Sequence, residues 1–424
     1  MVIANPYGRS VGRKEVQIPS SVKEKDEKTS ARGPQRWPQR PISLWELLLL
    51  LLLLYIDTGT IKPIKSRPYR VSPQHQQIIS RHINEILIDG IIELASGPYT
   101  APVTLQSKKD GSLRFCVDFR QLNSVTVRDV YPIPRIDDTL DQLQATKYFT
   151  SLDLKSGFWQ IELDDESRPK TAFVTHTGLF QFKVMPVGLP NAPATFQRLM
   201  DLVLGGPTWS CALHLNSVLE RIQSSGLTLH ISKCQFCKTK LKYLCHVVSQ
   251  SGIEPDPDKV HAVRDYPVPT RIKDVRAFLG LTSYYRCSIR NYATIPEPLI
   301  SLTRNIDSKP FLWTSSCQQA FDHLRHLLIQ APIISYPQFD KPFILQLDAS
   351  GFGLSAIPAQ KLIDDDSVKR EYVIGFASRT LSSSERHYSP TERECLAIIY
   401  GCSHFRPYLE DIRFTILTAH KALK

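Results

Sequence analysis

Short apolar strands interleaved with helices, in an irregular order, constrain the fold of this chain more than any other feature. Residues 113–119 alternate between apolar and polar side chains, and the apolar run at 148–154 includes a carboxylate near its end, Asp153. Turn-forming pairs such as Thr177-Gly178 separate these segments. Because no regular βαβ repeat is present, the sequence predicts an α+β fold.

Caps and apolar spacing place several further elements. Ser72-Pro73 opens a helix with isoleucines three to five residues apart, and Asn191 is a favoured N-cap for a helix expected at about 194–204. A helical linking domain is expected at 272–332, with one apolar face formed by Val275, Phe278, Leu279 and Leu281. The last part predicts strand, strand, helix and strand, at 343–348, 372–377, 392–405 and 414–417.

Length and charge limit the class of protein. A chain of 424 residues, 42% of them hydrophobic, can form two or three domains with separate cores. Its 52 Lys and Arg against 41 Asp and Glu give a net charge of +11, which favours polyanionic partners such as nucleic acid. Nine of the basic and four of the acidic residues lie in the first 40, a polar tail that we expect to be disordered.

An apolar run at 47–54 is similar to the hydrophobic part of a signal peptide, because it follows a basic stretch. It lies between Glu46 and Asp57, is too short to span a bilayer, and has no small-residue cleavage site after it. We interpret it as a low-complexity insertion or a mistranslated junction, and expect neither secretion nor membrane insertion.

The nine cysteines are an odd number, scattered along the chain, and are predicted to be reduced thiols. Cys234, Cys237, Cys245 and His246 have a spacing that also permits a zinc site. Four lysines lie among them, so we favour a nucleic-acid grip over zinc in this segment.

Several short motifs follow one another in a fixed order. They are Arg-Pro-Tyr-Arg at 67–70, the segment 113–123, Tyr-Pro-Ile-Pro at 131–134, Ser-Leu-Asp-Leu-Lys-Ser-Gly-Phe at 151–158, Lys-Thr-Ala-Phe at 170–173, Gly-Leu-Pro-Asn-Ala-Pro-Ala-Thr-Phe-Gln at 188–197 and Phe-Leu-Gly-Leu at 278–281. Together they resemble the gypsy-type reverse transcriptases of LTR retrotransposon Pol polyproteins, over about 57–424.

The resemblance implies four parts. They are a disordered basic tail with the leucine run at 1–56, right-hand polymerase fingers and palm at 57–270, a helical connection at 271–340, and a C-terminally truncated ribonuclease H-like domain at 341–424. The implied partners are an RNA template, a DNA primer, an RNA:DNA hybrid and deoxynucleoside triphosphates, in the nucleus or cytoplasm. Asp57-Thr58-Gly59 is also the signature of aspartic proteases, but the extended basic segment after it leaves no flap.

Nucleotidyl transfer commonly uses two Mg²⁺ ions held by carboxylates. By resemblance Asp153 is the first metal ligand and the carbonyl of Leu154 a further one; the alternative is an aspartate that caps the turn at 156–157. The resemblance also implies these substrate-binding residues: Lys108 and Arg114 on the triphosphate, Phe158 beneath the sugar, and Gln197. Val187 departs from the family pattern, so the resemblance does not assign a contact on that side of the nucleotide pocket.

A larger departure follows the helix expected at 194–204. The family continues with a hairpin that carries Tyr-x-Asp-Asp, whereas no Asp or Glu occurs here between Asp201 and Glu220. The junction is placed near Ala212, so one carboxylate remains where three are expected. We therefore expect no polymerase activity, and strand edges of the palm left exposed.

The ribonuclease H-like centre is expected to be incomplete as well. By resemblance Asp348 and Glu394 are its first two metal ligands, while Glu392, two residues away, points to another face of the helix. Ala419 replaces the third, an aspartate, and the fourth would lie beyond residue 424. Three interpretations stay open: a working reverse transcriptase, a non-catalytic relic that at most binds nucleic acid, which we favour, and a gene model that has lost the hairpin.

Overall fold

A computed structural model describes residues 2–5, 53–108, 111–144, 146–205, 213–304, 311–363 and 369–418. Contacts divide the chain into a first unit, 8–134 and 152–234, and a second unit, 2–7, 135–151 and 235–424. Most of the leucine run, the junction near Ala212 and Ala419 lie outside the described residues. Leu54, at the end of that run, is buried and forms a bridge with Leu163.

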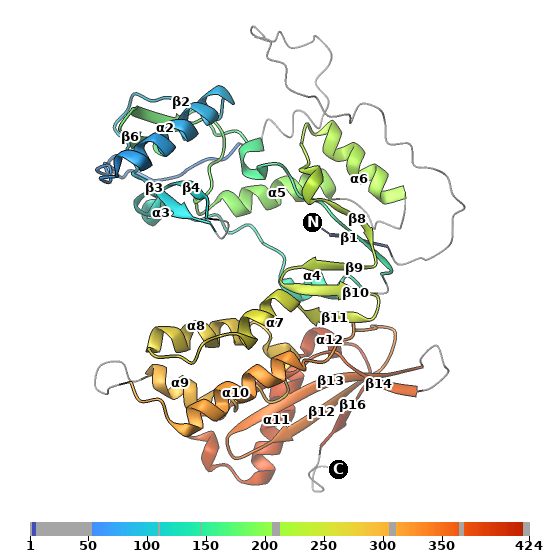
Figure 1. Cartoon of the computed structure of the whole chain (residues 1–424). Coiled ribbons are helices and arrows are strands. Elements are labelled where there is room, and N and C mark those ends of the chain that lie inside the picture. The colour runs from blue at the N-terminus through green and yellow to red at the C-terminus, as the bar shows by residue number, and fades with distance from the viewer. Residues whose placement is uncertain are drawn as a thin grey trace. The chain divides into compact units, whose positions relative to one another are not determined.

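The first unit mixes helices with small sheets (Figure 1). Its helices are α2 (Pro73–Ile88), α3 (Arg120–Val125), α5 (Ala192–Leu204) and α6 (Leu213–Ser224). One sheet has the order β2-β7-β6 and the other pairs β3 with β4; their strands are β2 (Ile92–Leu94), β3 (Val103–Ser107), β4 (Leu113–Val117), β6 (Phe173–Thr175) and β7 (Gly178–Phe182).

The ends of two predicted helices differ in how they are capped. Ser72 caps α2, because its hydroxyl accepts a hydrogen bond from the His75 amide at 3.4 Å, as its sequence predicts. Asn191 occupies the N-cap position of α5, as expected, but the helix starts at Ala192 and not at about 194, and the Asn191 side chain forms no capping hydrogen bond. Its side chain instead donates to the Val127 carbonyl at 2.8 Å and accepts from the Asp129 amide at 3.0 Å. Asn191 therefore ties the start of α5 to a distant loop.

The first elements of the second unit come from three separate parts of the chain. They are β1 (Val2–Asn5), α4 (Ile136–Asp141), β5 (Tyr148–Ser151), β8 (Gln235–Lys238), β9 (Lys240–Tyr243), β10 (His246–Ser249) and β11 (Gly252–Pro255). β5 pairs with β1 on one side and with β8 on the other. Our expectation of exposed strand edges was therefore wrong for β5, because both of its edges are paired.

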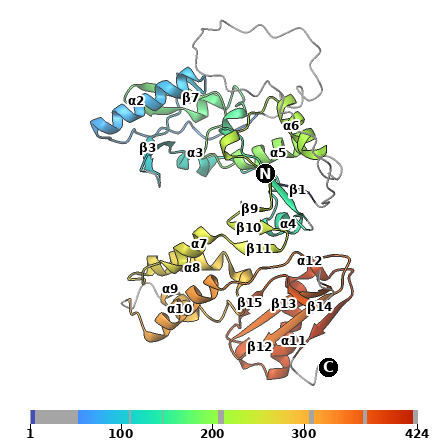
Figure 2. The same ribbon diagram turned by 45° about the vertical axis from the view of Figure 1, so that its right-hand side comes forward.

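Three helices lie in the segment predicted as the helical linking domain, and a fourth, α7, precedes them and lies beside them (Figure 2). They are α7 (Pro257–Arg264), α8 (Ile272–Ser283), α9 (Glu297–Arg304) and α10 (Ser315–Ile329). Val275 and Phe278 are fully buried against Phe321 of α10, while Leu279 and Leu281 pack at the edge of the same core. The predicted apolar face is confirmed.

The last part of the chain is a mixed sheet covered by α11 (Pro390–His404), as Figure 1 shows. The strand order is β14-β13-β12-β16, with β15 also on β13; the strands are β12 (Phe343–Ala349), β13 (Gly353–Ile363), β14 (Lys369–Val373), β15 (Ala377–Thr380) and β16 (Phe414–Leu417). β12 runs parallel to β16 and antiparallel to β13. β13 also runs antiparallel to β14. α12 (Arg406–Leu409) follows α11.

Two features of this sheet differ from our expectation. The strand predicted at 372–377 is two strands, since β14 ends at Val373 and β15 begins at Ala377. The sequence also gave no sign of β13, the longest strand, because Pro358 lies within it and proline disfavours a central strand. The carbonyl of Pro358 still accepts a hydrogen bond from the Ile374 amide at 2.9 Å. No described helix has both the length and the apolar character of a membrane span.

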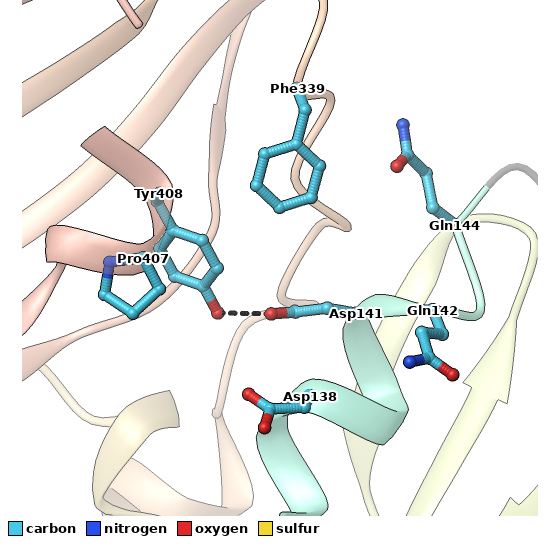
Figure 3. Close-up of a pocket in the computed structure, with 7 residues that line it drawn as sticks. All are labelled: Asp138, Asp141, Gln142, Gln144, Phe339, Pro407 and Tyr408. Carbon is cyan, nitrogen blue, oxygen red and sulfur yellow. Dashed lines mark hydrogen bonds between the residues drawn. The ribbon is translucent and has the colours of Figure 1, made fainter. Parts of the chain in front are cut away.

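A hydrogen bond attaches α4 to α12 within the second unit. The Tyr408 hydroxyl donates to the Asp141 carboxylate at 2.7 Å, at the side of a hollow of about 570 Å³ where Asp138 also lies (Figure 3). Burial raises the pKa of Asp141 to about 6, although the bond from Tyr408 lowers it; the nearby charges of Asp137 and Asp138 raise it further. At neutral pH Asp141 is therefore mostly ionised, although the folded environment favours its protonated form more than water does.

We predict that Asp141→Asn stabilises the protein at neutral pH. The folded pKa of Asp141 lies above its ordinary value, so protonation contributes stability that is complete below about pH 4 and is lost as the pH rises through about 6. An asparagine keeps an acceptor for Tyr408 without the charge. Denaturant unfolding should show a gain on the order of 2 kcal/mol at pH 7 that shrinks toward pH 4. An equal change at both pH values would contradict this account.

Candidate functional site

Asp153 lies two residues after β5 and is held by the segment 229–234 of the first unit. Its amide donates to the Cys234 sulfur at 3.4 Å, and its carbonyl accepts from the His230 amide at 2.8 Å. The carboxylate is 48% exposed and lies 3.6 Å from the Lys233 ammonium. Leu154 forms a bridge with Leu229. The turn-capping alternative finds no support in the described residues, where the partner of the Asp153 side chain is Lys233.

Phe158 belongs to a contact between two of the sequence motifs. Its ring meets the edge of the Phe196 ring from α5, with centroids 5.3 Å apart and planes at 65°. Gly157 allows this approach, because a Cβ there would lie 3.0 Å from the Phe196 ring. Phe158 is half-buried, so packing accounts for part of its role.

The other implied substrate residues fall into two places. Lys108 and Arg114 are exposed on the β3–β4 hairpin, where Arg114 pairs with Gln106 in register. Gln197 donates to Asp201 at 2.8 Å, and Asp201 accepts from Tyr131 at 2.7 Å, so the amide of Gln197 is already engaged. Val187 is 68% exposed. Among the described residues no hydrogen bond or ion pair joins the hairpin pair to Asp153.

Sequence reasoning missed the structural role of two motif residues. The Tyr69 hydroxyl donates to Asp118 at 3.0 Å, which connects the motif at 67–70 to the one at 113–123. Arg120 also bonds Asp118 through its side chain, at 2.7 Å, and holds the pKa of that carboxyl well below its ordinary value. The charged and aromatic residues of these motifs could have indicated this contact, because a carboxylate two residues before an arginine can pair with it locally.

The second centre lies on the sheet covered by α11. Asp348 is exposed near the end of β12, beside a hollow of about 400 Å³. Glu394 on α11 is only 8% exposed, and its carboxylate accepts a hydrogen bond from the Thr418 hydroxyl at 3.0 Å. Glu392 is exposed and forms a capping box with Ser389 at the start of α11. The structure thus gives Glu392 a capping role.

The cysteines of the zinc alternative are spread over several elements. Cys234 contacts Asp153, Cys237 lies in β8, and Cys245 occupies the turn between β9 and β10 with a φ of +60°. The Tyr285 hydroxyl donates to the Cys245 carbonyl at 2.6 Å. Across the described residues, no three His, Cys, Asp or Glu side chains come together as a metal site would require.

Gly401 sets the distance between α11 and the sheet, and so between the elements that carry Glu394 and Asp348. A Cβ at this position would lie 2.6 Å from Leu347, 3.1 Å from Ala356 and 3.2 Å from Leu345. Those three side chains are buried in the core beneath the helix. The close approach therefore requires glycine.

Family models match two parts of this chain. The description "Reverse transcriptase (RNA-dependent DNA polymerase)" fits residues 106–208, and "RNase H-like domain found in reverse transcriptase" fits residues 313–416. The Pol polyprotein from transposon 297 of Drosophila melanogaster is 38% identical over 395 residues, which cover 87% of this chain and 36% of that protein. The chain belongs to the reverse transcriptases of retrovirus-related Pol polyproteins.

A further relative agrees with this family, and a solved structure has a similar fold. The Pol polyprotein from transposon gypsy of Drosophila melanogaster is 31% identical, covering 96% of this chain and 42% of that protein. The chain thus spans less than half the length of these curated relatives. A foamy viral protease-reverse transcriptase structure in complex with double-stranded DNA has a TM-score of 0.76 at 20% identity, covering 86% of this chain and 67% of its own. The expected α+β polymerase fold with a ribonuclease H-like part is confirmed.

We predict that Gly401→Ala destabilises the protein by about 1–3 kcal/mol, because the added methyl group overpacks the core beneath α11. Gly280→Ala is the matched control: Gly280 also lies in a helix, α8, with nothing within 4 Å of an added Cβ. That control should gain up to about 1 kcal/mol from helix propensity. Chemical denaturation of both variants measures the difference, and equal stability of the two would show that α11 can shift without cost.

Proposed function

We propose that this reverse transcriptase segment binds nucleic acid but has incomplete metal centres for both polymerisation and RNA cleavage. The observation that carries the proposal is the ion pair between Asp153 and Lys233, at 3.6 Å, in a chain with no Asp or Glu between 201 and 220. The Lys233 ammonium gives Asp153 the positive charge that a metal pair would otherwise supply. The stretch between 201 and 220 adds no second carboxylate that could hold a metal together with Asp153.

Nucleic acid is the partner that chemistry and relatives both favour. The net charge of +11 attracts a polyanion. Similar solved structures are described as complexes with double-stranded DNA and with an RNA/DNA hybrid. On that basis the proposed partners of this chain are an RNA template, a DNA primer and their hybrid. The proposed domain boundaries are those expected from the sequence, near 57, 271 and 341. A nuclear or cytoplasmic location remains a prediction.

The polymerase centre does not fit a pair of Mg²⁺ ions. A two-metal clamp needs several carboxylates close together, and Asp153 with the Leu154 carbonyl supplies one carboxylate. The residue types that would contact a triphosphate and a sugar are present, at Lys108, Arg114 and Phe158. Nucleotide binding through them does not require the catalytic carboxylates.

The ribonuclease H-like centre keeps two carboxylates, Asp348 and Glu394, on adjoining elements. Two carboxylates fit one Mg²⁺ with several waters better than two ions. Glu394 is buried and bonded to Thr418, which orients it toward the end of β16. Ala419, next along the chain, offers no ligand atom in its side chain.

A working reverse transcriptase remains the second candidate, favoured by the ordered motifs from 108 to 197. The genomic DNA around the Ala212 codon discriminates between them. An in-frame segment that encodes Tyr-x-Asp-Asp would mean that the protein sequence lacks a hairpin which the gene possesses.

We predict no incorporation above background when the purified chain is given a primed homopolymer RNA template with Mg²⁺ or Mn²⁺. The reason is the missing carboxylates. Asp153→Asn is the internal control, since a trace activity that this change leaves untouched belongs to a contaminant. Incorporation that is clear in the original chain and lost in Asp153→Asn would sink the proposal for this centre.

We also predict that RNA in an RNA:DNA hybrid stays intact with this chain, and that Ala419→Asp alone does not restore cleavage. One added carboxylate gives three where the family uses four. Gel analysis of a labelled hybrid after incubation with Mg²⁺ or Mn²⁺ tests both statements. Cleavage by Ala419→Asp that disappears in the double variant with Asp348→Asn would show that the centre is otherwise complete.

A further inference from the structure

The two edges of β5 are paired in different ways within the second unit. On the side of β8 the register shifts between Phe149 and Ser151. On the side of β1 four consecutive pairs run in unbroken antiparallel register, from Val2 opposite Ser151 to Asn5 opposite Tyr148. The β1 side of β5 is therefore a regular ladder, which backbone groups form.

The edge of β5 that faces β1 is costly to leave open. Phe149 is fully buried in a core with Leu140 and Val248. Thr150, on the opposite face of the strand, is only 5% exposed, and its hydroxyl accepts a hydrogen bond from the Cys237 amide at 3.2 Å. An open edge would leave backbone polar groups beside these side chains without partners, or would expose the side chains to water. It would also offer an unpaired ladder to strands of other chains, so this edge requires an occupant.

The sequence of β1 suits it to this edge. Val2 and Ile3 are β-branched residues, which favour strands, and Pro6 follows directly with no N–H to continue the ladder. A ladder of backbone groups binds an extended conformation, and side chains only adjust the choice of sequence. Residues 6–52 join β1 covalently to the rest of the chain, so its local concentration at β5 does not depend on protein concentration.

We propose that the β1-facing edge of β5 is a peptide-binding groove for one extended segment of four residues, and that residues 2–5 of this chain occupy it as an intramolecular cap. In a chain without the hairpin expected from the family, strand edges of the palm need another cover. The cap covers the edge of the strand that leads to Asp153, and it keeps strands of other chains off β5. This role goes beyond the proposed function and does not depend on nucleic-acid binding.

The first test uses a matched pair of variants of the full chain, Ile3→Pro and Ala4→Pro. Backbone amides of adjacent strand residues point alternately toward and away from the neighbouring strand, so one of these prolines removes a ladder donor and the other faces away from β5. Hydrogen–deuterium exchange of the β5 amides, measured by mass spectrometry, should accelerate about tenfold or more in one variant and stay unchanged in the other. Equal exchange in the two variants would overturn the pairing through the backbone.

A synthetic peptide of residues 1–7 tests the groove and its occupant. Added at about 1 mM to the variant with accelerated exchange, the peptide should restore the protection of β5. The same peptide with an N-methyl group at the disruptive position should not restore it, because the ladder donor is missing. Failure of the unmodified peptide would overturn the groove as a binding site.

Dilution of the unaltered chain identifies which copy supplies the strand. Protection of β5 should survive about a hundredfold dilution, because the cap belongs to the same chain. Protection that disappears on dilution would mean that a second copy supplies the strand, which would overturn the intramolecular cap.

Discussion

A carboxylate at the end of a strand must be balanced by positive charge, and the identity of that charge decides what the first unit can do. In a two-metal polymerase the balance comes from divalent ions shared among several carboxylates. Here Lys233 lies 3.6 Å from Asp153, on the segment that also bonds the Asp153 backbone through His230 and Cys234. A single half-exposed carboxylate beside an ammonium is stable in water without a metal. The ion pair with Lys233 and the backbone bonds to His230 and Cys234 are therefore enough to hold Asp153 in place.

Packing gives the motifs a structural role that does not depend on catalysis. Gly157 and Phe158 meet Phe196, and Asn191 bonds the loop at 127–129, so the motifs at 151–158 and 188–197 support each other. Losing such contacts removes buried apolar area and leaves polar groups unpaired, which costs stability whether or not the site reacts. Motif residues thus serve two purposes, and the structural one is independent of metal.

The sequence predicted most where one residue type has one physical consequence. Ser72-Pro73 marked the start of α2, the apolar face of α8 marked the linking core, and the strand that carries Asp348 lay where its apolar run predicted. It predicted least where distant contacts override local preference. β13 contains a proline, the Asn191 side chain bonds a loop instead of capping its helix, and β1 pairs with β5 from almost 150 residues away. At the site, Asp153 could be found from its strand, but its lysine partner is 80 residues further on and carries no local signal.

Metal binding and nucleic-acid binding depend on opposite charges, and so they can be lost separately. A metal centre requires acidic ligands in a fixed geometry, and the loss of one ligand can disable it. Affinity for a phosphate backbone is the sum of many weak contacts with basic side chains, each of which matters little alone. The two kinds of binding use different residues, so the loss of an acidic ligand does not by itself remove basic contacts.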